Sequence, residues 1–407
     1  MNCRFCQNNL KIEFLDLGIM APANSYVSIE NLRKKHKEYP LRIMVCESCW
    51  LVQTEDFADK EEFFSSNYAY FSSTSKSWLD HAQKYVEKII KLENLGKNSF
   101  VIEVASNDGY LLKNFLYKNI PCLGIEPTLS TAKKAEEIGI NNEKIFLDKV
   151  NAYKLLEKYN KADLIIGNNV YAHVPDINDF TSSLEILLKD EGIITLEFPH
   201  LLNLLKFNQF DTIYHEHFSY LSLSVVKKIF EKNNLKIFNV EELETHGGSI
   251  RVYGCKINSN RKVSDNVGEL IKKEVLFNLE TIEIYENFKS KVENIKNKLN
   301  SVLKKIKSEK KKIFAYGAAA KGNTLLNYCG IKSNMIEAVV DLAPSKQNKF
   351  MPTSLIPIYH PSFLKDNKID YLLILPWNLK EEIIRQNNFL KESGTKFIIP
   401  IPDVEII

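Results

Sequence analysis

The stretch Ser99-Phe100-Val101-Ile102-Glu103-Val104-Ala105-Ser106-Asn107-Asp108-Gly109 decides the fold of the middle of this 407-residue chain. Its first six residues form an apolar, β-branched run that predicts a buried strand, and the polar residues after them predict a turn. A helical pattern follows at 110–116, and a second short strand at 122–127 carries an acid, Glu126, near its end. This order of strand, turn, helix and strand predicts a βα unit of a parallel sheet.

The same rhythm continues along the chain and returns near its end. Strands at 162–169 and 192–197 extend the first unit into a doubly wound parallel sheet, which binds ligands at the carboxyl ends of its strands. A second βα series begins with a strand at 312–317 and a helix at 323–328. Its further strands are expected at 336–341, 369–376 and 396–401. The chain therefore contains two α/β sheets, of which the second is the shorter.

A charged helical segment at 257–312 separates the two series. Ten Lys lie between 289 and 312, beside apolar residues that recur at helical spacing. A basic arm for nucleic acid is one interpretation, but the pattern favours a solvated helix face beside an apolar stripe. We expect this helix to bridge two domains.

Four of the seven cysteines form two Cys-x-x-Cys pairs near the start of the chain. Each pair presents two thiolates from one tight turn, and two such turns complete a tetrahedral zinc site. Because cysteine would fill all four positions, the metal would be structural, and the residues between the pairs would form a small strand-rich insert. The pairs are Cys3/Cys6 and Cys46/Cys49, whereas Cys122, Cys255 and Cys329 are interpreted as core residues.

Composition excludes several classes of protein. The formal charge is only +3, so a nucleic-acid backbone would need a local basic patch. No apolar run approaches the roughly 18 residues that span a bilayer. The odd number of cysteines and the polar first residues argue against an exported, disulfide-bonded protein. We therefore expect a cytoplasmic protein with no nucleic-acid partner and no membrane partner.

Two loops compete for a nucleotide. The loop at 317–322 has Ala319 where the dinucleotide fingerprint needs its middle glycine, which obstructs a pyrophosphate. Asp341 nevertheless follows the next strand, where a ribose-binding acid would lie, and a phosphate of another nucleotide could lie against Lys321. The loop at 103–109 instead begins with an acid, Glu103, and a second acid, Glu126, ends the next strand. This pair of acids suits the cationic amino-acid moiety and the ribose diol of S-adenosylmethionine.

The chain concentrates acid–base groups in the stretch Asp211-Thr212-Ile213-Tyr214-His215-Glu216-His217-Phe218. A neutral histidine accepts a proton near pH 7, and a neighbouring carboxylate can orient it. A His-x-His metal pair is a rival interpretation, but no further ligand lies at a supporting spacing. Hydrogen-bonded core histidines are the second alternative.

Several motifs occur in one order and together resemble a known family. They are the two cysteine pairs, Ser-Asn-Asp-Gly at 106–109, Asn-Val-Tyr-Ala-His-Val-Pro at 169–175, Tyr-His-Glu-His at 214–217, Thr-His-Gly-Gly-Ser-Ile-Arg-Val at 245–252 and Tyr-Gly-Ala-Ala-Ala-Lys-Gly at 316–322. The chain resembles, end to end, the three-domain sugar C-methyltransferases that make branched deoxysugars, the type that C-methylates the mycarose precursor of tylosin and the tetronitrose precursor of tetrocarcin.

The resemblance implies a fold of class α/β with three domains. A small zinc-binding domain would occupy residues 1–65, and a Rossmann-like S-adenosylmethionine-dependent methyltransferase domain residues 66–256. Residues 257–407 would form a second Rossmann-like α/β domain that contributes to binding the nucleotide-sugar. The protein would be a monomer or a weak oligomer.

The resemblance also implies roles for individual residues. Structural zinc would be held by Cys3, Cys6, Cys46 and Cys49. S-adenosylmethionine would be bound by Glu103, Ser106, Asn107, Gly109, Glu126 and Asn168. His217 would be the general base, and Tyr214, Glu216 and His173 would line the sugar pocket. Further substrate contacts would come from Tyr70, His246, Arg251, Tyr316 and Lys321.

The implied reaction is methylation of a carbon, expected to be C3, beside the 4-keto group of a nucleotide-diphosphate deoxysugar. The base would form an enolate, Tyr214 or His173 would stabilise its oxyanion, and the enolate would attack the sulfonium methyl. The product would serve a cell-surface polysaccharide or a glycosylated metabolite. O- or N-methylation of a related sugar is the main alternative, and a zinc-ribbon protein that methylates RNA is a further one.

Two departures from the family bear on the substrate. Relatives usually have Ser-Ser-Tyr-Ser where this chain has Ser-Ser-Thr-Ser at 72–75, so Thr74 would shift a sugar contact to Tyr68 or Tyr70. Relatives also tend to have Pro-Gly near Pro352, and this chain has no Gly there. Both differences are consistent with a different sugar or nucleotide.

Overall fold

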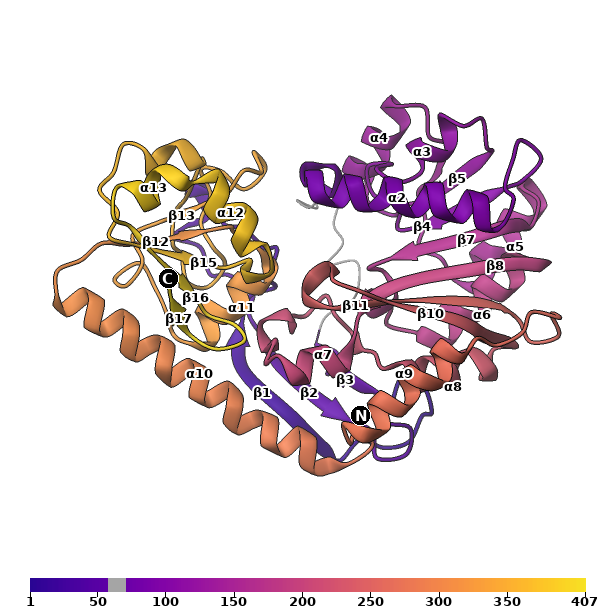
Figure 1. Ribbon diagram of the computed structural model, residues 1–407, viewed down its shortest axis with the longest axis horizontal. Helices are drawn as coiled ribbons and strands as arrows, with labels where there is room; N and C mark the ends of the chain where they lie inside the picture. Colours follow the sequence, from indigo (N-terminus) through magenta and orange to yellow (C-terminus); the bar gives the residue numbers. More distant parts are fainter. Residues whose placement is uncertain (58–70) are drawn as a thin grey trace.

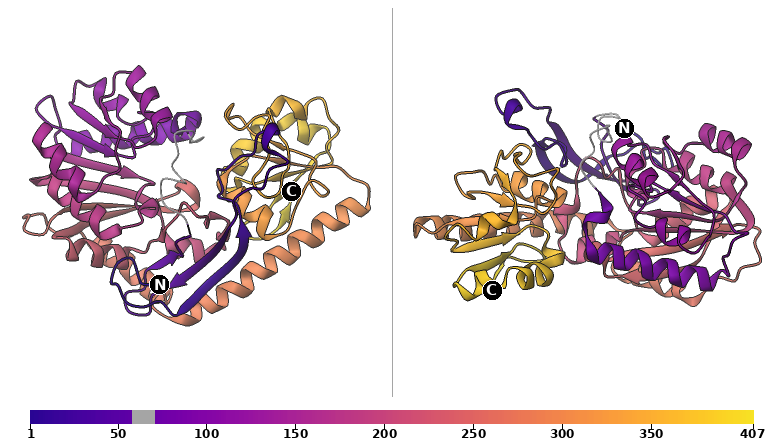
Figure 2. Two further views of the ribbon diagram at one scale, coloured as in Figure 1. Left: turned by 180° about the vertical axis from the view of Figure 1, so that it is seen from behind. Right: turned by 90° about the horizontal axis from the view of Figure 1, so that it is seen from above.

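The computed structural model of the protein describes residues 1–57 and 71–407. Two α/β bodies lie side by side, and the N-terminal strands lie at the base between them (Figure 1). The views from behind and from above show the same arrangement (Figure 2). The predicted contact at Tyr70, and its alternative Tyr68, lie outside the described residues.

The N-terminal segment forms an antiparallel sheet with strand order β1-β2-β3-β9. Its strands are β1 (Ile12–Met20), β2 (Tyr39–Val45), β3 (Val52–Thr54) and β9 (Ser219–Tyr220). The predicted strand-rich insert between the cysteine pairs is confirmed. The last strand comes from the stretch just after His217, so this sheet joins the N-terminal segment to the histidine cluster.

The central sheet has seven strands in the order β10-β11-β8-β7-β4-β5-β6. Five of them run parallel, as predicted, whereas β11 and β10 pair antiparallel and complete one edge. The bounds are β4 (Val101–Val104), β5 (Cys122–Ile125), β6 (Asn142–Glu143), β7 (Ala162–Asn168), β8 (Leu188–Pro199), β10 (Leu235–Leu243) and β11 (Ser249–Lys256). The doubly wound parallel sheet is confirmed for the four predicted strands, and an antiparallel hairpin that was not predicted completes the edge.

Alternation along the strands places helices on both faces of this sheet. Val101 packs with α2 (Lys76–Leu92), α3 (Lys113–Leu116) and α4 (Leu129–Glu137). Its neighbour Ile102 packs on the opposite face with α5, α6, α8 and α9. Those helices span Lys149–Lys158, Ile177–Leu187, Leu223–Lys232 and Asp265–Leu276. A short helix, α7 (Leu201–Lys206), follows β8.

The turn after β4 is longer than the sequence suggests. The helix predicted at 110–116 begins only at Lys113, because residues 110–112 still belong to the turn. Gly109 has a φ of +76°, and a Cβ there would lie 3.1 Å from Ala135 and Ile140. Glycine is therefore needed at this position for both its backbone angle and its lack of a side chain.

The C-terminal body is a six-stranded sheet in the order β14-β13-β12-β15-β16-β17. Its strands are β12 (Ile313–Tyr316), β13 (Val339–Val340), β14 (Ile358–Tyr359), β15 (Tyr371–Ile374), β16 (Lys396–Ile399) and the antiparallel β17 (Glu405–Ile406). The helices are α11 (Ala320–Tyr328), α12 (Lys380–Gln386) and α13 (Asn388–Glu392). The second α/β sheet is thus confirmed, with shorter strands than predicted.

The charged segment contains the long helix α10 (Ile282–Ser308), which runs from the base of the molecule beside β1 to the C-terminal body (Figure 1). Its predicted apolar stripe, including Val292, Leu299 and Ile306, is buried against residues of β1, β2 and the C-terminal sheet. None of the ten Lys between 289 and 312 is buried, which confirms the solvated-face interpretation. Within the described ranges, no helix combines the length and apolar character that a membrane span requires.

Candidate active site

One cavity of about 1060 Å³ opens where the central sheet faces the C-terminal body. It lies at the carboxyl ends of β4, β5, β7 and β8, as expected for a doubly wound sheet. Asn24 lines it from the N-terminal segment, and Lys321, Lys346 and Asn378 line it from the C-terminal body. All three parts of the chain therefore contribute to one site.

One end of the cavity is formed by the predicted cofactor loop. Asn107, Glu126 and Asn168 all line it. The Glu126 carboxylate accepts hydrogen bonds from the backbone N–H of Asn107 at 2.9 Å and of Thr128 at 2.8 Å, and it sits just after β5. Burial raises the pKa of Glu126, and these hydrogen bonds oppose that shift. This carboxylate lies where a ribose diol binds in such sheets.

The other predicted cofactor residues lie behind the cavity surface. Glu103 is 1% exposed, and burial, together with the charges of Asp108 and Glu126, raises its pKa well above the usual range. Ser106 donates a hydrogen bond to Asn142 at 3.1 Å, and Gly109 shapes the turn. These residues support the loop, whereas Asn107, Glu126 and Asn168 face the cavity.

Unsatisfied polar atoms show that this end fits S-adenosylmethionine. Among the described residues, both carboxylate oxygens of Glu103 and both amide atoms of Asn168 lack hydrogen-bond partners. Orphaned buried polar atoms are costly unless a ligand or water satisfies them. An amino-acid moiety, with its ammonium and carboxylate groups, offers the donors and acceptors that such atoms need.

The other end of the cavity contains the histidine cluster. Nδ1 of His217 donates to the Thr212 carbonyl at 2.9 Å, so Nε2 carries the lone pair. Nδ1 of His173 lies 2.7 Å from the Glu216 carbonyl, and the rings of the two histidines are 4.6 Å apart. The Tyr214 ring lies 3.9 Å from the ring of His217. His173, Tyr214 and His217 all line the cavity.

Burial keeps these imidazoles neutral. It lowers the pKa of His217 well below 6.5, and the charges that His173 and His246 carry when protonated, together with the charge of Lys321, lower it further. Burial also lowers the pKa of His173 to about 4. Both side chains therefore carry no charge near pH 7, and a neutral imidazole is the form that accepts a proton.

Glu216 and His215 occupy different surroundings from His217. Burial raises the pKa of Glu216 to about 7, and its Oε1 accepts from the Asn24 amide at 3.2 Å. His215 points to the carbonyls of Tyr39 and Pro40 on β2, at 3.3 and 3.2 Å. The core-histidine interpretation therefore holds for His215, while Glu216 lies behind the cavity wall. Asn24 was missed because nothing in its sequence neighbourhood marks a binding residue.

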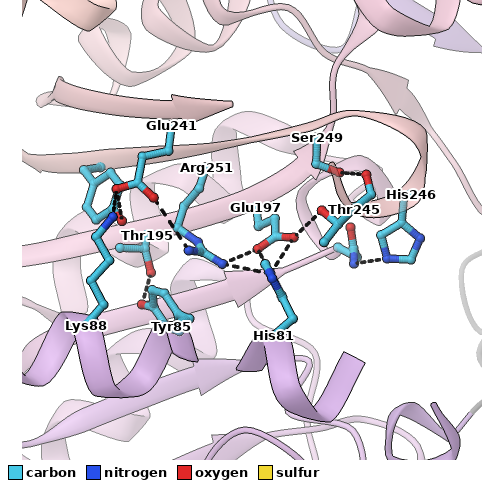
Figure 3. A network of polar contacts seen from close by, with 12 residues as sticks. His81, Tyr85, Lys88, Thr195, Glu197, Glu241, Thr245, His246, Ser249 and Arg251 are labelled. Carbon is cyan, nitrogen blue, oxygen red and sulfur yellow. Dashed lines mark hydrogen bonds and ion pairs between the residues drawn. The ribbon is translucent and has the colours of Figure 1, made fainter. Parts of the chain in front are cut away.

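A buried ion-pair network links β8 and β11 to α2, as Figure 3 shows, and two of its members, His81 and Thr245, line the cavity. The Glu197 carboxylate on β8 accepts from His81 at 2.9 Å and from the Thr245 hydroxyl at 2.8 Å, and it pairs with Arg251 on β11. Burial opposes ionisation of Glu197, but His81 and the Arg251 charge outweigh it and lower the pKa to about 2. The guanidinium of Arg251 also lies 4.1 Å from the Tyr85 ring.

This network separates two residues that the sequence motif placed together. His246 lines the cavity, with Nε2 3.0 Å from the Asn169 amide nitrogen and a left-handed φ of 55°. Arg251 is 3% exposed, does not line the cavity and is bound to Glu197 instead. Sequence reasoning missed His81 and Glu197, because their partners come from distant parts of the chain.

In the predicted loop of the C-terminal body, too, one of the two predicted substrate residues lines the cavity and the other does not. Lys321 lines the cavity, whereas Tyr316 is buried in β12 away from it. The Asp341 carboxylate accepts from the backbone N–H of Ala318 at 2.7 Å and of Ala343 at 2.8 Å. Asp341 thus binds its own loop, and it does not line the cavity. Thr74 is exposed and does not line the cavity.

The four predicted zinc ligands come together away from the cavity. The Sγ atoms of Cys3, Cys6, Cys46 and Cys49 all lie within 4.8 Å of one another. Two thiolates from each of two tight turns match the donor set of a closed, tetrahedral zinc site. None of the four lines the cavity, which agrees with a structural metal.

Three family models match the chain in succession. They describe a zinc binding domain at residues 3–64, a methyltransferase domain at 78–240 and a C-methyltransferase C-terminal domain at 244–402. The C-methyltransferase NovU of Streptomyces niveus is 30% identical over 405 residues, which cover 100% of this chain and 96% of NovU.

Solved methyltransferase structures match the chain over about half of its length. An S-adenosylmethionine-dependent methyltransferase from Anabaena variabilis is 14% identical and covers 49% of this chain and 96% of its own, with a TM-score of 0.39. Magnesium protoporphyrin IX methyltransferase from Synechocystis, with bound SAH, is 15% identical and covers 44% and 82%, with a TM-score of 0.35.

Cys46→Ser should lower the zinc content of the purified protein and its melting temperature, because a structural zinc site contributes directly to folding. Metal analysis by mass spectrometry and a thermal melt measure the two effects. Cys255→Ser, which alters a buried thiol outside the cluster, is the control and should keep the zinc. Full zinc content in the Cys46 variant would contradict the assignment.

Arg251→Met should destabilise the central domain by about 3–5 kcal/mol, because it removes the full positive charge that pairs with the buried Glu197 carboxylate. Denaturant unfolding followed by fluorescence measures the change. Lys88→Met is the matched control, since Lys88 pairs with Glu241 at the exposed end of the same network and such pairs contribute about 0–1 kcal/mol. Equal losses of unfolding free energy in the two variants would show that the buried Glu197–Arg251 pair stabilises the domain no more than the exposed pair does.

Proposed function

This chain belongs to the three-domain, zinc-containing C-methyltransferase family, and we propose that it methylates a nucleotide-linked 4-keto-deoxysugar at C3, beside the ketone. The enzyme uses S-adenosylmethionine as its methyl donor and has a zinc-binding domain. The product would be a branched sugar for a cell-surface polysaccharide or a glycosylated metabolite.

The proposal rests on one observation, the orientation of the His217 imidazole. Its Nδ1–H is bound to the Thr212 carbonyl, and the ring lines the cavity that also contains the cofactor loop. Nε2 therefore carries a lone pair at the end of the cavity opposite Glu126. A general base in this position suits a substrate whose carbon must lose a proton before it can accept a methyl group.

His217 would remove the proton beside the ketone, which leaves an enolate with its charge on the ketone oxygen. Tyr214 lies next to the His217 ring and would stabilise that oxygen with its hydroxyl. The predicted help from His173 does not fit, because its Nδ1–H is bound to the Glu216 carbonyl and its Nε2 carries a lone pair in the neutral ring. When bound, S-adenosylmethionine would supply an electrophilic methyl group to the enolate carbon, with S-adenosylhomocysteine as the leaving group. The cavity holds both substrates so that carbon and methyl meet in line.

The cofactor is placed by the loop after β4 and the acid after β5. Glu126 would bind the ribose hydroxyls, and Asn107 and Asn168 would contact the amino-acid end. In the C-terminal body, Lys321 and the loop at 317–322 would face the nucleotide-sugar.

His217→Asn should lower the rate of deuterium exchange beside the ketone by about 10²–10⁴-fold, because it removes the general base. The assay incubates the enzyme with a panel of nucleotide-linked 4-keto-6-deoxysugars in D₂O, and NMR and mass spectrometry follow exchange and methylation. His215→Asn is the matched control, since that histidine faces β2 carbonyls, and it should retain the exchange rate. Calorimetry should give normal affinity for S-adenosylmethionine in both variants.

The same assay separates the alternatives. A new methyl group on carbon, accompanied by exchange in the unaltered enzyme, supports the enolate route. A methyl group on oxygen or nitrogen without any exchange would replace this proposal by O- or N-methylation. Lost cofactor affinity in the His217 variant would contradict its role as base.

The pH profile of methyl transfer should stay flat from about pH 8 down to pH 6.5 and fall only below that value. Protonation removes the lone pair of His217, and burial, with the charges that His173 and His246 carry when protonated and the charge of Lys321, places its pKa well below 6.5. Initial rates at saturating substrates measure the profile. A break near pH 7 would instead assign the rate to Glu216, whose pKa is about 7.

A further inference from the structure

Helix α11 of the C-terminal body is bound directly to the segment that carries the histidine cluster. The Thr324 hydroxyl donates to the Ile213 carbonyl at 2.7 Å, and the Asn323 amide donates to the Ala23 carbonyl at 2.6 Å. Both side chains are about 1% exposed. The first turn of α11 therefore has a fixed position relative to His217, although the two are about one hundred residues apart in sequence.

Lys321 lies in this first turn and lines the cavity. Its ammonium group donates to the Asn378 side-chain oxygen at 2.8 Å and lies 4.6 Å from the centre of the Trp377 ring. The indole N–H of Trp377 in turn donates to Asp211 at 2.7 Å. In the part of the chain that the structure describes, Asn378 is the hydrogen-bond partner of Lys321, which leaves two of its three N–H donors for a ligand.

The countercharge of Lys321 is the carboxylate of Asp211, which binds the indole of Trp377. Burial raises the pKa of Asp211 to about 6, while the charge of Lys321 and the Trp377 hydrogen bond lower it, so Asp211 is mostly ionised near pH 7. Its carboxylate accepts from the indole N–H of Trp377, and the ion pairs of the described residues do not include Asp211 with Lys321. Lys346, by contrast, donates to the Ala318 carbonyl at 2.8 Å and lies 3.7 Å from Asp341. The field of Lys321 is therefore the less neutralised of the two inside the cavity.

The field of Lys321 acts on the reacting end of the cavity. Its positive charge lowers the pKa of both His217 and His246. An imidazole with a lowered pKa is a weak base, so removal of a carbon-bound proton requires that the product anion be stabilised. A cation that disfavours an imidazolium ion at this place favours an oxyanion at the same place.

We infer that Lys321 is a catalytic residue, whose ammonium group, positioned by α11 and Asn378, stabilises the oxyanion of the enolate that His217 forms. This inference rests on the proposed enolate mechanism. It gives the C-terminal body a part in the chemical step as well as in holding the nucleotide-sugar. The proton leaves the substrate carbon for His217, and the negative charge moves to the ketone oxygen beside the ammonium group.

The test compares Lys321→Met and Lys321→Gln with Lys332→Met, which removes an exposed lysine just after α11. The first measurement is the rate of deuterium exchange beside the ketone, without methyl donor, on a 4-keto-6-deoxysugar that the unaltered enzyme exchanges. We expect both Lys321 variants to lose about 10²–10³-fold, the usual effect of removing one oxyanion donor, and Lys332→Met to match the unaltered enzyme.

The second measurement is the affinity for the nucleoside diphosphate alone, by calorimetry. We expect it to change less than about twofold in the Lys321 variants, because their lost interaction exists only when the oxyanion forms. Lost nucleoside-diphosphate affinity with a normal exchange rate at saturation would show that Lys321 binds phosphate, and would overturn the inference. Normal exchange with normal affinity would overturn it as well.

The Gln variant guards against a folding defect, since its amide keeps a hydrogen-bond donor for Asn378 without the charge. A melting temperature equal to that of the unaltered enzyme, with the exchange rate lost, assigns the effect to the charge. If the unaltered enzyme exchanges no keto-sugar of the panel but methylates an oxygen or nitrogen, the proposed function fails first. If the unaltered enzyme exchanges and the Lys321 variants do too, the inference alone fails.

Discussion

The hydrogen bond from Nδ1 of His217 to the Thr212 carbonyl fixes which nitrogen of the imidazole carries the lone pair, and much of the architecture holds that bond in place. Thr324 on α11 binds the Ile213 carbonyl from one side, and the β3 hydroxyl of Thr54 lies 3.2 Å from the His217 carbonyl on the other. The segment is thus clamped between the N-terminal sheet and the C-terminal body. A loop held only by its own domain would leave the tautomer and ring orientation free to vary.

This clamp gives the zinc-binding segment a physical role at a distance from the chemistry. Arg4, in the first cysteine turn, donates to the Pro175 carbonyl at 3.1 Å, and its own carbonyl accepts from the Asn178 amide at 3.1 Å. These bonds hold the loop that begins at His173. The metal therefore orders a turn that supports the cavity wall, while its closed ligand set keeps it out of the reaction. The proposed nucleotide-sugar, the methyl donor and the proposed base would then meet in the cavity to which three parts of the chain contribute.

Sequence reasoning found the parts of the site that depend on local rules. Glu126 follows a strand, His217 lies in a polar run, and the cysteines have knuckle spacing, so each is visible without a structure. It could not find Asn24, His81 or Glu197, because their roles come from partners in other domains. Arg251 was interpreted as a substrate contact because its motif also contains His246, yet strand alternation and the buried carboxylate of Glu197 turn it away from the cavity. The antiparallel edge of the central sheet was missed for a similar reason, since strand direction depends on pairing and is not encoded in one strand's pattern.

Two buried acids near the cavity, Glu197 and Asp211, differ in how closely a positive charge is paired with them. Glu197 is bound directly by Arg251 and His81, so this group is close to neutral and serves as a wall. Asp211 instead accepts from the Trp377 indole N–H, and the ammonium group of Lys321 lies over the same indole ring. The indole therefore connects the two charged groups, which do not form a direct ion pair. A buried cation whose countercharge, Asp211, does not pair with it directly is unfavourable alone in such a site. Together with a weak base, it suits a reaction that creates a negative oxygen between them, because the transition state supplies the charge that the resting site lacks.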